Sequence, residues 1–121
     1  MKNKLRLFLT TLGFLAVAQA GWAHAFLDHA DPAVGSKVHG SPRVVKLWFT
    51  EKLEAALCKL QVFNESGQEV DKRDQASSAG DPASLTVSLP PLQSGKYKVV
   101  WRAVSVDTHV TKGDFQFEVS P

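Results

Sequence analysis

Three residues of this chain have types and spacing suited to holding a metal ion. Asp107 and His109 are separated by one residue, and in an extended backbone residues i and i+2 project from the same side. They can therefore offer a carboxylate oxygen and an imidazole nitrogen to one point, with Thr108 facing away. The pattern is weak by itself, because a turn-capping aspartate beside a surface histidine has the same spacing.

The third residue, His24, matters only if processing makes it the first residue. A free α-amino group and the imidazole of one residue form a two-nitrogen chelate. With Asp107 and His109, the set then has three nitrogens and one oxygen, which suits tetragonal Cu(II). Zinc, which prefers a tetrahedral arrangement, is the chief competitor.

Residues 1–23 have the pattern of a secretory signal peptide, with a basic start, an apolar stretch over 7–20 and small residues after it. The stretch is interrupted and shorter than the roughly 20 apolar residues that span a membrane. We therefore predict an exported domain over 24–121 that is not embedded in a membrane. Composition leaves three cleavage sites open, which would expose Gly21, His24 or Phe26.

Charge argues against a nucleic-acid-binding surface. The chain has 121 residues with 14 basic and 12 acidic side chains. Three of the basic ones precede residue 7, so the 98 residues after position 23 carry 11 basic and 12 acidic side chains. Such a length makes one small domain, and the single cysteine, Cys58, excludes an internal disulfide.

The remaining histidines and sulfur-bearing residues suggest less chemistry. His39 lies in a predicted turn and is expected in solvent, whereas His29 is either an exposed histidine or an auxiliary ligand. Cys58 has no histidine nearby in the sequence and is expected in the core. Met1 is the only methionine, so neither a blue-copper site nor a thioether site for Cu(I) is expected.

The elements that must position these residues are strands. Apolar residues alternate with polar ones along several segments separated by Gly- and Pro-containing turns, which predicts an all-β fold, a single antiparallel β-sandwich. A short helical or loop element is expected at 51–57, and a mobile loop at 71–83. A strand is expected at 44–49, and the residues expected to alternate onto one face of the other strands are Leu60, Val62, Leu85, Val87, Leu89, Tyr97, Val99, Trp101, Ala103, Phe115, Phe117 and Val119.

Several motifs together resemble the CopC/PcoC copper-resistance family, and they extend through nearly all of the chain after the leader. They are His24-Ala25-Phe26-Leu27, Ala30-Asp31-Pro32-Ala33 with Gly35 and Ser36, Leu47-Trp48-Phe49-Thr50-Glu51, Gly95 to Arg102, Val104 to His109, and Gly113 with Phe115, Phe117 and Val119.

The resemblance implies a periplasmic Greek-key β-sandwich, of immunoglobulin-like or cupredoxin-like type, that binds copper. It favours cleavage before His24, with the amine and ring of His24, Asp107 and His109 as ligands of one Cu(II) ion. It also implies that Glu51 lies near the metal site without being a ligand and orients His24 or its amine by a hydrogen bond. The stretch 64–83 lacks the methionines of two-site members, which indicates the Cu(II)-only type. Val110 stands where many members have proline.

The function expected from these features is copper sequestration, copper resistance or delivery of copper to an inner-membrane transporter by a monomeric, non-catalytic protein. An alternative is a copper-dependent oxidative enzyme that uses an N-terminal histidine clamp. A carboxylate in one equatorial position would disfavour that chemistry, because it stabilises Cu(II) and fills a position that oxygen needs. A metal-free β-sandwich interaction module is the third alternative.

Overall fold

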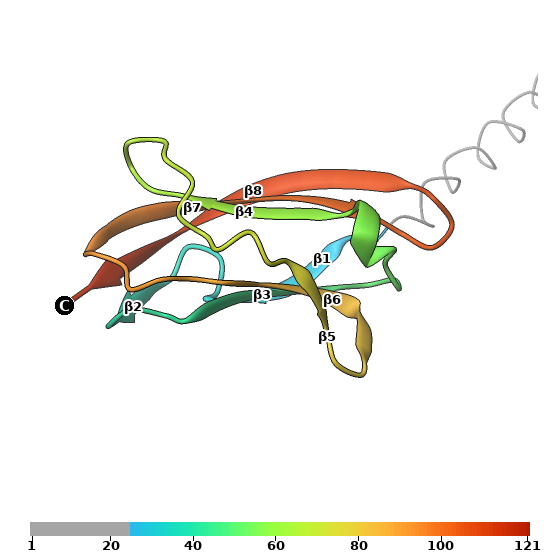
Figure 1. Ribbon diagram of the computed structural model, residues 1–121, viewed down its shortest axis with the longest axis horizontal. Helices are drawn as coiled ribbons and strands as arrows, with labels where there is room; N and C mark the ends of the chain where they lie inside the picture. Colours follow the sequence, from blue (N-terminus) through green and yellow to red (C-terminus); the bar gives the residue numbers. More distant parts are fainter. Residues whose placement is uncertain (1–24) are drawn as a thin grey trace, which may run out of the picture.

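Two four-stranded sheets pack face to face in the computed structural model, which describes residues 25–121 (Figure 1). The predicted signal peptide over 1–23 and the candidate ligand His24 lie outside the described residues. One sheet has the strand order β1 (Leu27–Asp31), β3 (Val44–Phe49), β6 (Asp81–Ser88) and β5 (Ala76–Ser78). The other has the order β2 (Lys37–His39), β8 (Val110–Ser120), β7 (Gly95–Val104) and β4 (Lys59–Phe63).

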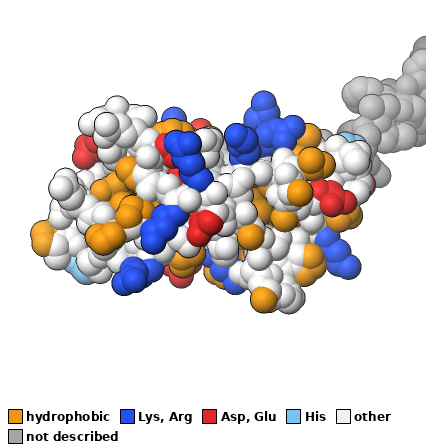
Figure 2. Space-filling model, viewed as in Figure 1, with side chains coloured by type: hydrophobic (Ala, Val, Ile, Leu, Met, Phe, Trp, Pro, Cys, Tyr) orange, Lys and Arg blue, Asp and Glu red, His pale blue; other side chains and the backbone are white. Residues whose placement is uncertain are grey.

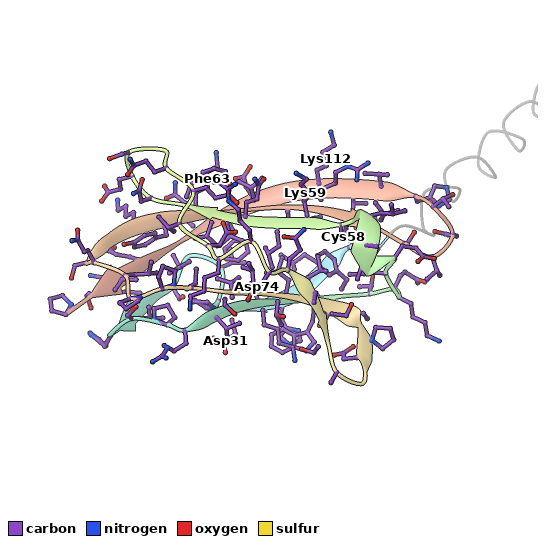
Figure 3. The ribbon with its side chains drawn as sticks, in the orientation of Figure 1. Asp31, Cys58, Lys59, Phe63, Asp74 and Lys112 are labelled. Atoms are coloured by element: carbon purple, nitrogen blue, oxygen red, sulfur yellow. The ribbon has the colours of Figure 1, made fainter. Side chains whose placement is uncertain are left out.

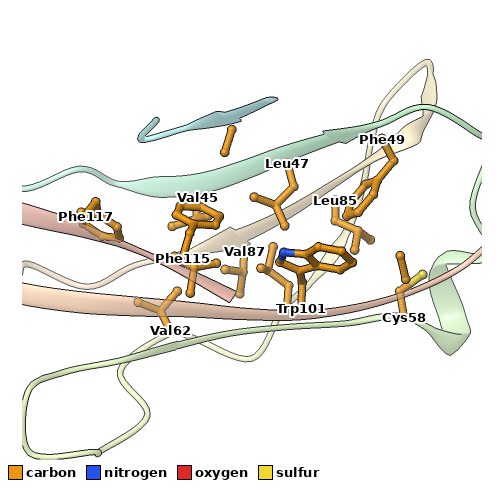
Figure 4. Packing of buried hydrophobic residues seen from close by; sticks show 14 of the residues in the cluster. Val45, Leu47, Phe49, Cys58, Val62, Leu85, Val87, Trp101, Phe115 and Phe117 are labelled. Carbon is orange, nitrogen blue, oxygen red and sulfur yellow. The ribbon is translucent and has the colours of Figure 1, made fainter. Parts of the chain in front are cut away.

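The predicted β-sandwich is confirmed, and its register follows from the alternation of apolar residues. The side chains that alternate inward from the two sheets form one buried cluster between them (Figure 4). Across the β7–β8 pair, Trp101 lies opposite Gly113. A Cβ at Gly113 would lie 2.5 Å from Cζ2 of Trp101, so glycine is required for the indole to lie across β8.

One strand pairing departs from the predicted antiparallel arrangement. β2 runs parallel to β8, with Val38 opposite Val119, while every other strand pair in the described part of the chain is antiparallel. β7 and β8 pair over ten consecutive positions, from Gly95–Val119 to Val104–Val110. This long hairpin carries the candidate ligands Asp107 and His109 at its tip.

The prediction of a mobile loop over 71–83 is wrong. The segment contains β5 and the start of β6, and it is held by polar side chains bonded to the backbone. The buried carboxylate of Asp71 accepts hydrogen bonds from the amides of Val62 and Arg73, at 2.8 and 3.1 Å. The Ser84 hydroxyl accepts a hydrogen bond from the Ser78 amide at 3.0 Å. Small polar residues that look unstructured in the sequence are fixed here by such bonds.

Two other local predictions hold. A 3₁₀ turn, η3 (Ala55–Leu57), lies within the predicted element at 51–57. Cys58 is buried, and this burial raises the pKa of its thiol above the ordinary value. Within residues 25–121, no helix has the length and apolar character needed to span a membrane.

Candidate metal centre

Asp107 and His109 lie in the loop that joins β7 to β8. The extended geometry expected for them is wrong, because β7 ends at Val104 and Thr108 has a left-handed backbone with φ of 71°. The two side chains nevertheless meet, since Oδ2 of Asp107 lies 3.2 Å from Nδ1 of His109. Their side chains are 45% and 49% exposed, so the pair faces solvent while remaining in contact.

Ser105 holds this loop in shape, and the sequence analysis did not identify it as a positioning residue. The residue is buried, and its hydroxyl donates a hydrogen bond to Oδ1 of Asp107. Its amide donates to the carbonyl of His109 at 3.0 Å, and its carbonyl accepts from the Thr108 amide at 2.8 Å. The Ser-x-Asp-x-His spacing is the only sequence signal for this arrangement, because the hydroxyl acts through a turn.

The environment of Asp107 favours the charged form of its carboxylate. The hydrogen bond from Ser105 is the largest cause that lowers the pKa of Asp107 below its ordinary value, and His109 contributes less. Each carboxylate oxygen has two lone pairs. The contacts with Ser105 and His109 therefore do not exhaust the capacity of Asp107 to act as a ligand.

The start of the described chain is fixed beside this loop. The Thr111 hydroxyl, two residues after His109, donates to the carbonyl of Ala25 at 2.6 Å. On the other side, Phe26 and Thr50 exchange two hydrogen bonds of 2.9 Å, one from each amide. Ala25 is buried, so the residue that follows His24 is held between the two sheets at the end where the candidate ligands lie.

Glu51 follows Thr50 and is brought to the same end of the sandwich. The amide of Val106 donates to the carbonyl of Lys52 at 3.1 Å, and Leu53 forms a β-bridge with Ser105. The Glu51 side chain is exposed. Within residues 25–121, however, no three His, Cys, Asp or Glu side chains form a group able to hold a metal ion.

The other two histidines in the described part of the chain lie in strands β1 and β2. His29 is in β1 on the outer surface of its sheet, where its ring stacks on Trp48 with centroids 4.2 Å apart. Its Nδ1 lies 2.7 Å from Oδ2 of Asp28. His39, predicted in a turn, is instead the last residue of β2, but it is exposed as expected. Its Nδ1 lies 2.9 Å from the Ser120 hydroxyl.

The described residues thus supply a carboxylate and an imidazole in contact at an exposed loop. Oxygen and imidazole donors are compatible with Cu(II), Zn(II) and other divalent metals, and two donors alone make a weak site. Ala25, the first described residue, is bonded to the strand that begins beside His109, so the start of the described chain lies next to this pair.

Comparisons with known proteins by sequence and by structure point to the same protein family. Residues 27–120 match the model of the CopC domain family. Protein YobA from Escherichia coli strain K12 is 33% identical over 118 residues, which is 97% of this chain and 95% of that protein.

Two similar crystal structures are of CopC from Methylosinus trichosporium OB3b and of PcoC, a methionine-rich copper resistance protein from Escherichia coli. The first has a TM-score of 0.76 and 34% identity, covering 81% of this chain and 95% of that one. The second has a TM-score of 0.71 and 32% identity, covering 81% and 100%. The CopC family model matches most of this chain, and a relative with 33% identity matches 97% of it. The chain therefore belongs to the CopC family.

Proposed function

We propose that this protein binds one Cu(II) ion as cargo and serves copper resistance, by sequestering the metal or by passing it to an inner-membrane transporter. A copper-related resistance role is what its relatives' names support, since PcoC is described as a copper resistance protein. The same description calls PcoC methionine-rich, whereas this chain has one methionine, Met1. Without a set of thioethers, the donors that remain favour Cu(II) over Cu(I).

The proposed ligands are the α-amine and imidazole of His24, the carboxylate of Asp107 and the imidazole of His109. The observation that carries this assignment is the hydrogen bond from Thr111 to the carbonyl of Ala25. It ties the residue next to His24 to the strand that begins beside His109. Removal of residues 1–23 would then add two nitrogen donors to the Asp107–His109 pair.

Glu51 is proposed to orient the His24 end of the site from outside the ligand shell. The residues on either side of Glu51 form backbone hydrogen bonds with the two segments that carry the proposed ligands. Thr50 is bonded to Phe26, and Lys52 is bonded to Val106. A carboxylate that accepts a hydrogen bond from a ligating imidazole or amine fixes its direction. Glu51 is exposed, so it can turn toward the ligands without a rearrangement of the core.

The protein is further proposed to act in the periplasm, as a monomer and without catalytic activity. Export follows from the signal-peptide pattern of residues 1–23. A carboxylate ligand at Asp107 adds negative charge and stabilises Cu(II) against reduction. The copper-loaded protein should therefore produce no more peroxide with ascorbate than free copper does, and faster production would contradict the carrier role.

Equilibrium dialysis against Cu(II), combined with the intact mass of the exported protein, tests the proposal. We expect a mass that corresponds to a chain starting at His24 and one copper ion per chain. The His109→Ala variant should lose this ion, whereas His39→Ala should retain it, because His39 contacts Ser120 at the opposite end of β8. A native start at another residue, or a ratio near zero, would overturn the assignment.

A further inference from the structure

A row of three positive side chains crosses the outer face of the second sheet. Lys59 of β4 lies opposite Arg102 of β7, and Arg102 lies opposite Lys112 of β8. All three are exposed and alternate with inward-facing neighbours. Figure 3 shows Lys59 and Lys112 projecting from this face, and blue side chains gather there in Figure 2. We call these three residues the basic row.

The basic row has an energetic cost that no ion pair with a described residue relieves. Directly opposite residues on neighbouring strands have Cβ atoms about 5 Å apart, and like charges at such positions destabilise a sheet. Among the described residues, no carboxylate lies within ion-pair distance of these three cations. The Arg102 guanidinium is held in place by a hydrogen bond of 2.9 Å to the carbonyl of Leu57. Arg102 is therefore preorganised to bind an anionic group, and Lys59 and Lys112 flank it with free positive charge.

The wider face has the same sign. Six of the 11 basic residues after position 23, but two of the 12 acidic ones, face outward on this sheet. The basic ones are Lys37, Lys59, Lys96, Lys98, Arg102 and Lys112, and the acidic ones are Asp114 and Glu118. Lys37 lies 4.0 Å from Glu118, whereas the basic row brings three cations without an ion pair to directly opposite positions on neighbouring strands.

The surface at the row is hollowed and partly apolar. The basic row borders an open hollow of about 480 Å³, with half-buried Val100 at its floor and Gly113 beside it. Asp114 lies on its wall. This shape accepts a protruding peptide segment that carries carboxylates and an apolar side chain. A bilayer of anionic phosphates is disfavoured, because its flat surface cannot enter the hollow.

The row also lies beside the candidate metal loop. The Arg102–Lys112 pair is two register steps from Val104–Val110, beyond which the chain enters the loop with Asp107 and His109. Two steps correspond to about 7 Å along a strand. A segment bound in the hollow would therefore place its own protein next to the metal ion.

We propose that the basic row and its hollow form the docking site for an acidic segment of a partner protein that exchanges copper with this one. The copper exchange rests on the proposed function, whereas docking of an acidic segment does not. Docking is measured on metal-free protein, so its outcome does not depend on whether the protein binds copper. The dialysis experiment measures copper binding alone.

The test titrates the exported, metal-free protein with an acetylated Glu-Glu-Phe-Glu-Glu peptide and follows backbone amides by NMR. Shifts should concentrate at Gln61, Arg102, Lys112 and Gly113. The double variant Lys59→Gln/Lys112→Gln should weaken binding about tenfold, since two exposed charge contacts are lost. Both substitutions are at exposed positions and leave Arg102 bonded to Leu57, so the fold should be kept.

The matched control is Lys96→Gln/Lys98→Gln, which removes the same charge from the same face. It should weaken binding less than about threefold. Equal losses in the two variants would overturn the proposal, because binding would then follow total charge rather than the basic row. Row-dependent binding to phosphatidylglycerol vesicles without binding to the peptide would also overturn it, in favour of a membrane surface.

Discussion

The described residues include two exposed aspartate–histidine contacts, which differ in what surrounds them. In β1, Oδ2 of Asp28 lies 2.7 Å from Nδ1 of His29. In the β7–β8 loop, the corresponding distance between Asp107 and His109 is 3.2 Å. The pair with the shorter distance, Asp28 and His29, is nevertheless the weaker candidate for metal binding.

The difference lies in the surroundings. The ring of His29 stacks on Trp48, which also has the ammonium group of Lys46 4.7 Å from its ring centroid. The His29 ring is thus already packed against Trp48, and the positive charge of Lys46 nearby disfavours a metal cation. Asp107 and His109 lie instead in a loop supported by Ser105 and next to the anchored Ala25. We therefore assign the proposed metal site to the pair beside the start of the described chain, although its local contact is the longer one.

The largest expected effect comes from blocking the chain start. One glycine added before His24 converts the α-amine to an amide and displaces the imidazole, so two nitrogen donors are lost. We expect Cu(II) affinity to fall by about 1,000-fold, since even residues outside the ligand shell are worth about 10–100-fold. Competition titration with a copper chelator measures this. Unchanged affinity would mean that His24 does not form the clamp.

Next in size is the effect of removing one imidazole. His109→Ala should reduce Cu(II) affinity about 100-fold, more than removal of an outer partner usually does. The matched variant His29→Ala should leave affinity within about threefold. Similar losses in the two variants would erase the distinction between the two aspartate–histidine contacts.

A smaller effect is expected from the carboxylates. Asp107→Asn keeps the shape of the side chain but removes its charge, and we expect a loss of affinity of about 30-fold. Asp28→Asn, which changes the other aspartate–histidine contact in the same way, should have no measurable effect. Isothermal titration with a competing chelator separates the two, and a larger loss from Asp28→Asn would contradict the site assignment.

The smallest effect is expected at Ser105. Ser105→Ala removes the main hydrogen bond that lowers the pKa of Asp107, so this pKa should rise in the metal-free protein. The carboxylate then takes up its proton at a higher pH, and Cu(II) affinity should fall by up to about tenfold, more at pH 5 than at pH 7. NMR titration of the side chain gives the pKa.

A matched control for Ser105 exists on the same strand pair. Ser120→Ala removes a hydroxyl that contacts another histidine, His39, at 2.9 Å. It should leave both the pKa of Asp107 and the Cu(II) affinity unchanged. If Ser105→Ala behaved in the same way as this control, the hydroxyl would have no part in positioning Asp107.

Local patterns were sufficient for much of the fold. Alternation along Tyr97, Val99 and Trp101 predicted a strand with one buried face, and β7 has that face. The stretch 71–83 was predicted wrongly, since its small polar residues have no periodicity. Its order comes in part from bonds to Val62 and Ser88, which lie outside the segment. Contacts of that kind leave no signal in the segment itself.

At the candidate site, too, local sequence patterns predicted one part of the arrangement and the folded structure decided the rest. Residue types and spacing made Asp107 and His109 only a weak candidate pair, and the resemblance to the CopC family strengthened it. One methionine and one cysteine gave no basis for predicting thioether or disulfide chemistry. Their contact arises from a left-handed residue at Thr108 and a hydroxyl at Ser105, not from the extended backbone that the spacing suggested.

What the amino-acid order determined, then, is the set of available donors and the faces of the strands, because both depend on residue type and on a period of two. Only the tertiary structure decided that Ala25 lies beside Thr111, and that Lys59, Arg102 and Lys112 line up across three strands. These placements depend on the register between strands far apart in the chain. That register is fixed by packing of the whole core and not by any one segment.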